Sequence, residues 1–147
     1  MKEARIADVH AAMARGELSC VELAQAYVER IEQLDTFPVL EAGGLPLNSI
    51  VQINPAWREQ AEALDEAYAS AGLSGPLHCA PVILKDLYDT EDFPTTAASL
   101  SLLGSQPPDD AHSVKGLRAA GALILAKAAM TEFALSLIHI SEPTRPY

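Results

Sequence analysis

Two short runs in which every residue is apolar constrain the fold more than any other feature of this sequence. They are Val82–Leu84 and Ala122–Ala126. Apolar runs of this length, bounded by turn residues, are typical of strands that are buried on both faces. Such strands need neighbouring strands and covering layers of other elements. The sequence therefore predicts an α/β fold.

Helical signals precede the first run. Residues 6–15 predict a short helix that stops at Gly16, and Ser19 with Glu22 forms a capping box that opens a second helix. Its core face is predicted from apolar residues at helical spacing, namely Leu23, Tyr27, Ile31 and either Leu34 or Val28.

A strand–helix–strand unit is predicted next. Residues 49–53 form a strand candidate, Asn54 and Pro55 start a helix, and Gly72 ends it. The strands on either side of this helix are expected to be parallel, or near neighbours in a mixed sheet. One helix side is predicted to pack in the core (Trp57, Ala61, Leu64, Tyr68, Ala71) and the other to be acidic and solvated (Arg58, Glu59, Glu62, Asp65, Glu66).

The second apolar run follows a further predicted helix, residues 111–120, which ends at Gly121. The apolar character continues past this strand, but Lys127 and Glu132 interrupt it well short of the ~20 uncharged residues that a membrane span needs. A membrane span is therefore excluded, and a second helix–strand unit is predicted. Residues 36–48 form an irregular connection without a readable role.

Lys85 is the residue of greatest functional interest, because it stands where the strand predicted at residues 82–84 ends. In open α/β sheets, ligands usually bind in the crevice beyond the carboxyl ends of the strands. Lys85 is therefore a candidate catalytic residue. The structural alternative is a solvated surface pair between Lys85 and Asp86.

Three ordered segments resemble the amidase signature family. They are GPLHCAPVILKD, the following PTTAASL, and the run LRAAGALILAKAAMTEFA, and the resemblance covers most of residues 6–134. It implies that residues 1–134 are the N-terminal portion of a mixed α/β/α sandwich. Two residues depart from the family pattern: Cys79 and Ala98 stand where glycine is usual, which makes a positive φ angle an issue at both positions.

The resemblance also implies a chemistry. The intact parent is expected to hydrolyse amide bonds of small-molecule or peptide substrates by acyl transfer with a Ser-cisSer-Lys triad, whose lysine matches Lys85. No two serines are adjacent in this chain, so both catalytic serines are expected beyond residue 134 and the fragment is expected to be inactive. The alternatives are a subunit of a transamidating amidotransferase complex and a non-catalytic amidase-like binding module.

Composition excludes several other classes. The net charge of −10 argues against a nucleic-acid partner, which would need clustered Lys and Arg. Motifs of other hydrolases, phosphate loops and metal sites are absent, so neither a cofactor nor a metal is expected. Cys20 and Cys79 are far apart, so both are expected to be reduced thiols. The first residues lack the apolar core of a signal peptide, which favours a cytoplasmic location.

The last residues of the sequence indicate a segment that does not come from the parent protein. LSLIHISEPTR resembles the translation of an adapter used in preparing sequencing libraries, and the tail 135–147 is therefore interpreted as non-native. The structural alternative is a terminal strand at residues 137–140 followed by a proline-rich tail. We exclude residues 135–147 from the fold prediction.

Overall fold

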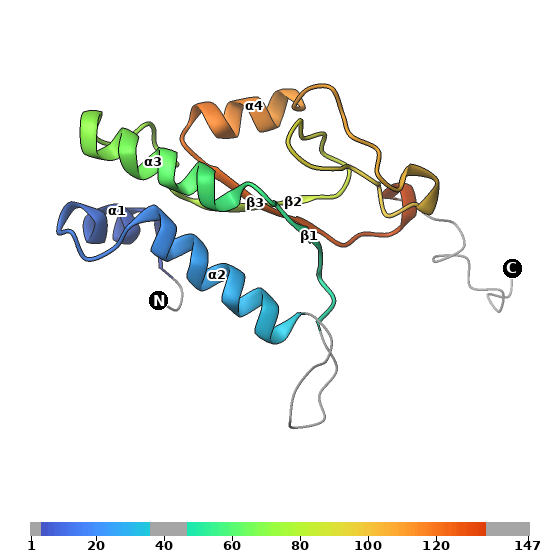
Figure 1. Ribbon diagram of the computed structural model, residues 1–147, viewed down its shortest axis with the longest axis horizontal. Helices are drawn as coiled ribbons and strands as arrows, with labels where there is room; N and C mark the ends of the chain where they lie inside the picture. Colours follow the sequence, from blue (N-terminus) through green and yellow to red (C-terminus); the bar gives the residue numbers. More distant parts are fainter. Residues whose placement is uncertain (1–3, 36–46, 135–147) are drawn as a thin grey trace, which may run out of the picture.

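The computed structural model describes residues 4–35 and 47–134, in which helices cover both faces of a small mixed sheet (Figure 1). The sheet has three strands in the order β1 (Ile50–Ile53), β3 (Leu123–Ala128), β2 (Pro81–Lys85). The described residues form four α-helices, which are α1 (Ile6–Ala14), α2 (Cys20–Leu34), α3 (Trp57–Ala71) and α4 (His112–Ala119). In Figure 1, α2 and α4 lie on opposite sides of the strands.

Each face of the sheet has its own core. Residues of α1, α2 and α3 pack with Leu123 and Leu125 on one face. On the other face, Ile124 packs with Leu84 and with Val114 of α4. The mixed α/β fold predicted from the sequence is thereby confirmed. The irregular connection at 36–48 falls mostly outside the described residues.

Of the two arrangements predicted for the first two strands, that of near neighbours in a mixed sheet is confirmed and a parallel orientation is wrong. β3 is inserted between β1 and β2, parallel to β2 and antiparallel to β1, so β1 and β2 neither pair nor run parallel. The sheet is mixed, as predicted. The apolar run Leu123–Ala126 suits β3 to the centre, where the first five residues of the strand are fully buried, whereas β1 carries the exposed Val51 and the polar Gln52. An alternation of strand and helix in a sequence does not show where a later strand will insert.

β2 is an edge strand of the described sheet. Leu84 is buried, but Ile83 is 43% exposed, so the expectation that the whole run 82–84 is buried was wrong for the described chain. The corresponding expectation for the run 122–126 is confirmed, since all five residues are buried.

A bulge in β3 determines which way its side chains point. The register shifts between the second and third residues of β2, which leaves Leu125 without a partner on β2. Beyond the bulge, Lys127 lies opposite Leu84, while Lys85 is the next residue along β2. Residues directly opposite share a face and successive residues alternate between faces. The side chains of Lys85 and Lys127 therefore point to opposite faces of the sheet.

Most helix predictions are confirmed. Ser19 Oγ accepts a hydrogen bond from the Glu22 amide at 3.1 Å, and the Glu22 carboxylate accepts one from the Ser19 amide at 2.8 Å. Tyr27 is an error, because it is 41% exposed and the core face of α2 instead runs through Leu23 and Val28. Helix α1 ends before Gly16, as predicted.

Helix α3 differs from its prediction at two places. Asn54 does accept a hydrogen bond from the Ala56 amide, but the helix begins at Trp57 rather than at Pro55. Asp65 was assigned to the solvated side, yet its carboxylate accepts hydrogen bonds from the amides of Cys20 and Val21 at 2.7 and 3.1 Å. An acidic side chain at the start of a helix satisfies free amides and complements the helix dipole. Asp65 thus fixes α2 against α3.

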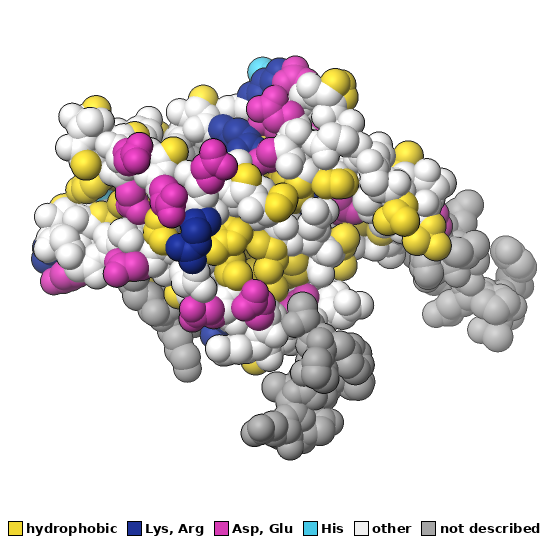
Figure 2. Space-filling model, viewed as in Figure 1, with side chains coloured by type: hydrophobic (Ala, Val, Ile, Leu, Met, Phe, Trp, Pro, Cys, Tyr) yellow, Lys and Arg dark blue, Asp and Glu magenta, His cyan; other side chains and the backbone are white. Residues whose placement is uncertain are grey.

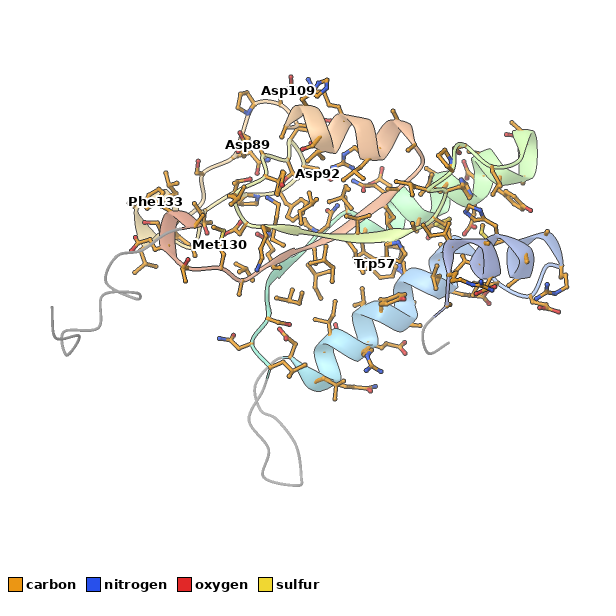
Figure 3. All side chains as sticks on the ribbon, turned by 180° about the vertical axis from the view of Figure 1, so that it is seen from behind. Trp57, Asp89, Asp92, Asp109, Met130 and Phe133 are labelled. Carbon is orange, nitrogen blue, oxygen red and sulfur yellow. A yellow bond between two sulfur atoms is a disulfide. The ribbon has the colours of Figure 1, made fainter. Side chains whose placement is uncertain are left out.

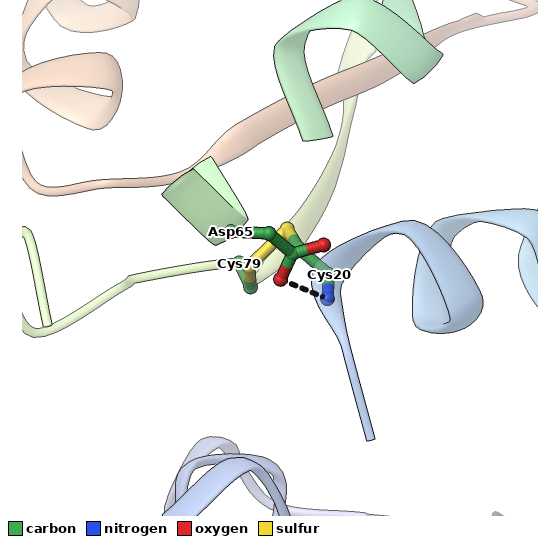
Figure 4. Close-up of side chains that lie close together, drawn as sticks. All are labelled: Cys20, Asp65 and Cys79. Carbon is green, nitrogen blue, oxygen red and sulfur yellow. Dashed lines mark hydrogen bonds between the residues drawn. A yellow bond between two sulfur atoms is a disulfide. The ribbon is translucent and has the colours of Figure 1, made fainter. Parts of the chain in front are cut away.

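The prediction of reduced thiols was wrong. Cys20 and Cys79 form a disulfide between the start of α2 and the segment before β2, with the two Cα atoms 5.4 Å apart (Figure 4). Both residues are fully buried. The pair is separated by 59 positions and follows no spacing motif, so only the packing of α2 beside the segment before β2 brings the two sulfurs together.

Candidate active site

Lys85 lies at the carboxyl end of β2. Its Nζ donates a hydrogen bond to the carbonyl oxygen of Ala129 at 2.8 Å, and its side chain is exposed in the described part of the chain. Ala129 follows β3 directly, and β2 and β3 are parallel. The ends of two parallel strands therefore meet around this lysine, which is the position that the sequence predicts for a ligand-binding crevice.

Asp86 does not form the surface pair with Lys85 that was the structural alternative. Its side chain is buried, and its Oδ1 lies 4.0 Å from the Nζ of Lys127, which is also fully buried. In the described part of the chain, Lys85 makes no ion pair with Asp86.

Asp86 holds a turn formed by residues 96–99. Its carboxylate accepts hydrogen bonds from the amide and the hydroxyl of Thr96, and its backbone oxygen accepts one from the Ala97 amide at 2.7 Å. Ala97 and Ala98 have φ angles of 49° and 56°. Cys79 likewise has a φ of 59°. The positive φ that the two departures from the glycine pattern raised as an issue is thus present at both Cys79 and Ala98.

Ser99 connects this turn to the segment after β3. Its hydroxyl donates to a carboxylate oxygen of Glu132 at 2.6 Å, and its side chain is buried. The Phe133 amide also donates to the Ala97 carbonyl at 2.9 Å. Figure 3 shows Met130 and Phe133 beyond the end of the sheet. Sequence reasoning treated Glu132 only as a charge that interrupts an apolar run.

Lys127 is the second residue that sequence reasoning missed. Its Nζ donates to the carbonyl oxygens of Tyr88 and Pro94 at 2.9 and 3.3 Å and to the hydroxyl of Thr95 at 2.8 Å. Burial lowers the pKa of Lys127, and the charge of Asp86, followed by those of three further aspartates, opposes that shift. The available signal was its place directly after the apolar run 122–126, where a charge needs a buried partner.

A polar cluster anchors the other side of the same loop. Arg118 of α4 forms ion pairs with Asp92 and Asp110 at 2.8 Å each, and Asn54 donates to Asp92 at 3.0 Å. Burial alone would raise the pKa of Asp92, but the hydrogen bonds from Gln60, Arg118 and Asn54 and the charge of Arg118 together lower it. The loop between β2 and α4 is therefore fixed by buried or half-buried charges at both ends.

A family model described as Amidase matches residues 22–145. This chain belongs to the amidase family. The matched range includes Lys85 and the strand end described above. The match extends into residues 135–145, whose non-native origin stays a prediction.

The amidase chain has relatives with several names. It is 43% identical over 129 residues to a glutamyl-tRNA(Gln) amidotransferase subunit of Thermobifida fusca, covering 88% of this chain and 24% of that protein. It is 36% identical over 135 residues to a putative amidase of Schizosaccharomyces pombe, covering 91% of this chain and 22% of that protein.

Solved structures confirm the amidase fold. The native peptide amidase from Stenotrophomonas maltophilia is 36% identical with a TM-score of 0.78, and the match covers 90% of this chain and 26% of that one. An amidase family protein from Bacillus anthracis is 32% identical with a TM-score of 0.77, covering 89% and 25%. This amidase chain therefore spans about a quarter of the length of its relatives.

A metal centre is not formed by the cysteines of the amidase chain. Ligand atoms of Cys20, Asp65 and Cys79 lie within 4.8 Å of one another, but the two sulfurs are bonded to each other and Asp65 caps α2 (Figure 4). Within the described residues, no helix has the length and apolar content required to cross a membrane.

Proposed function

We propose that the intact parent protein hydrolyses amide bonds with Lys85 as the base of a Ser-cisSer-Lys triad. The observation that carries this proposal is the position of Lys85 at the joined ends of β2 and β3, in a chain that belongs to the amidase family. Both serines would come from a part of the parent beyond residue 134. They would reach the face of the sheet on which the Lys85 side chain lies exposed.

The chemistry requires a neutral amine at Lys85. Lysine is ordinarily protonated at pH 7, with a pKa of about 10.4. The remainder of the fold would cover the exposed side chain, and removal from water disfavours its charged form. The neutral amine would then take a proton from the bridging serine, which in turn would take one from the nucleophilic serine as that serine attacks the amide carbonyl. The leaving amine would receive the proton, and water would hydrolyse the acyl-enzyme.

The substrate would be a small-molecule or peptide amide. The peptide amidase of Stenotrophomonas maltophilia, at 36% identity, supports this substrate class. The relatives named as subunits of glutamyl-tRNA(Gln) amidotransferase support a second candidate, in which the parent is the amide-cleaving subunit of a transamidating complex. A partner protein that receives ammonia, encoded near the completed gene, would favour the second candidate. Neither candidate gives the chain itself a nucleic-acid surface, consistent with its net charge of −10.

A cytoplasmic location is part of the proposal, but the bond between Cys20 and Cys79 argues against it and gives it a test. Disulfides are rare in cytoplasmic proteins, where thiols are kept reduced. Trapping the free thiols of the parent by alkylation in its source cells, followed by mass spectrometry, would find Cys20 and Cys79 alkylated if the location is cytoplasmic. A bonded pair would contradict the location without affecting the proposed chemistry.

The decisive experiment replaces Lys85 by Ala in the completed parent. Loss of the base lowers the chemical step by several powers of ten while the fold remains intact, which circular dichroism would confirm. Lys115→Ala is the matched control, because Lys115 is an exposed lysine that pairs with Asp109 on the surface of α4. Turnover by Lys85→Ala close to that of the control would refute the assignment of Lys85 as the base, whereas a folded parent without turnover would leave the non-catalytic binding module.

The 147-residue chain itself is expected to be inactive and at best marginally folded. A base without its serines and oxyanion donors cannot form an acyl-enzyme. Apolar side chains also remain at the surface, as Figure 2 shows in the middle of one face and at its right-hand end. Leu100 and Leu103 are 87% and 78% exposed. Turnover of a generic amide by the chain that is lost in Lys85→Ala would contradict this expectation.

A further inference from the structure

A fully buried lysine organises the loop that follows the candidate base. Lys127 lies on the face of the sheet opposite Lys85, with no exposed surface, above the ring of Phe93 at 4.8 Å from its centroid. Burying a charged amine has a large desolvation cost unless each of its protons finds an acceptor. An apolar residue would fill this position without that cost, so the ammonium has a function other than packing.

The surroundings of Lys127 match a charged ammonium group. Its three protons have three acceptors, the carbonyl oxygens of Tyr88 and Pro94 and the hydroxyl of Thr95. The Thr95 hydroxyl uses its own proton to bond the Tyr88 carbonyl at 3.2 Å, so it can only accept from Lys127. Asp86 supplies the counter-charge at 4.0 Å.

These contacts reach both ends of the loop that begins directly after Lys85. The Asp86 carboxylate accepts a hydrogen bond from Thr96 in the turn, while Lys127 donates hydrogen bonds to residues 88, 94 and 95. The Asp86 amide also donates to the carbonyl of Ala128, next to Lys127, at 3.2 Å. The carbonyl that accepts from Lys85 belongs to the residue after that, Ala129. One buried pair of charges therefore fixes where β2 ends and where the Lys85 side chain emerges.

We propose that Lys127 is a positioning residue for the base Lys85, acting through Asp86 and the loop 86–99. This inference rests on the proposed function, since it assigns to Lys127 an effect on the reaction of Lys85. Without the ammonium, two loop carbonyls and a buried carboxylate lose their partner, and the loop moves until water or another group reaches them. A displacement of about 1 Å at a catalytic group can cost about 100-fold in rate.

The test replaces Lys127 by Met in the completed parent, which keeps the length and apolar stem of the side chain. We expect kcat to fall about 100-fold with KM changed less than about threefold, because the base is misplaced while the rest of the binding site is not. Amide hydrogen exchange over residues 86–99 should accelerate at least about tenfold, with β1 unaffected. Lys115→Met, on the surface of α4, is the control and should change neither quantity.

Two further tests follow, and the first keeps the proposal falsifiable if Lys127→Met does not fold. Thr95→Val removes one acceptor and is expected to lower kcat about tenfold, and wild-type kcat in that variant would overturn the proposal. The Lys127→Met/Asp86→Asn double variant should lose less than the product of the two single losses, since both residues act through one network. Wild-type kcat in Lys127→Met, or independent effects of the two substitutions, would overturn the proposal.

An inactive wild-type parent would instead refute the proposed function. The hydrogen-exchange comparison would then still decide whether Lys127 holds the loop. Unchanged exchange over residues 86–99 in Lys127→Met would show that it does not.

Discussion

The disulfide between Cys20 and Cys79 provides the sharpest test of how this chain holds together. It closes a loop between residues 59 positions apart. On the chain-entropy account, a loop of that length restricts the unfolded chain by an amount worth about 4 kcal/mol at 25 °C. This is comparable to the whole stability of a small domain at the low end of the usual range, about 5 kcal/mol. Reduction should therefore leave residues 1–134 close to unfolded.

Amide hydrogen exchange measures this directly in the central strand, Leu123–Ala126. A difference of about 4 kcal/mol corresponds to a protection factor that falls about 1,000-fold, since each 1.4 kcal/mol is about a factor of ten. The comparison uses residues 1–134 oxidised, reduced, and as the Cys20→Ser/Cys79→Ser double variant, which should match the reduced chain. A protection factor in the reduced chain within about tenfold of that in the oxidised chain would refute the reasoning. The packed side chains alone would then hold the fold, and the disulfide would add little to its stability.

Three further predictions concern the parent protein. Gly121→Ala should lower its thermal midpoint, because φ is 88° and the new Cβ would lie 2.9 Å from the Cα of His78, whereas Gly116→Ala, with free space on α4, should leave it unchanged or raise it. The pKa of Asp92 is lower in the folded than in the unfolded chain, so its ionised carboxylate stabilises the fold. This stabilisation is complete above the unfolded pKa of about 3.9 and is lost as the pH falls through the folded pKa. The difference in unfolding free energy between wild type and Asp92→Asn, measured by urea titration, should therefore shrink from pH 6 to pH 3. Amplification of the source locus should give a reading frame that departs near residue 135 and continues to adjacent serines, and the same tail with a stop codon in unamplified DNA would contradict this.

Local signals in the sequence were enough to predict much of the fold. The capping box at Ser19 and Glu22, the stop at Gly72 and the buried run 122–126 depend on neighbours within one turn or one strand, and all three are confirmed. Lys85 was found at a strand end because a change from apolar to charged residues marks that end.

Long-range pairings were not readable in the same way. The insertion of β3 between β1 and β2, the bond between Cys20 and Cys79, and the cap that Asp65 places on α2 each join residues whose spacing has no period. Lys127 was missed for a related reason. In the sequence, Lys127 only interrupts an apolar run. Its function depends on the loop carbonyls and Asp86 that surround it, and the sequence does not show that they lie close to it.

The bulge at Leu125 limits how this segment can be recombined with other amidases. If β3 kept all its residues but lacked the bulge, regular alternation would carry Lys127 to the face of Leu123, beneath the apolar layer of α1, α2 and α3. Deleting Leu125 would leave Lys127 opposite Leu84 but would remove one apolar side chain from the core on the other face. Chimeric enzymes that exchange N-terminal segments should accordingly keep Leu123–Ala128 and the loop 86–99 from a single parent, with crossover points at 72–75 or beyond residue 134.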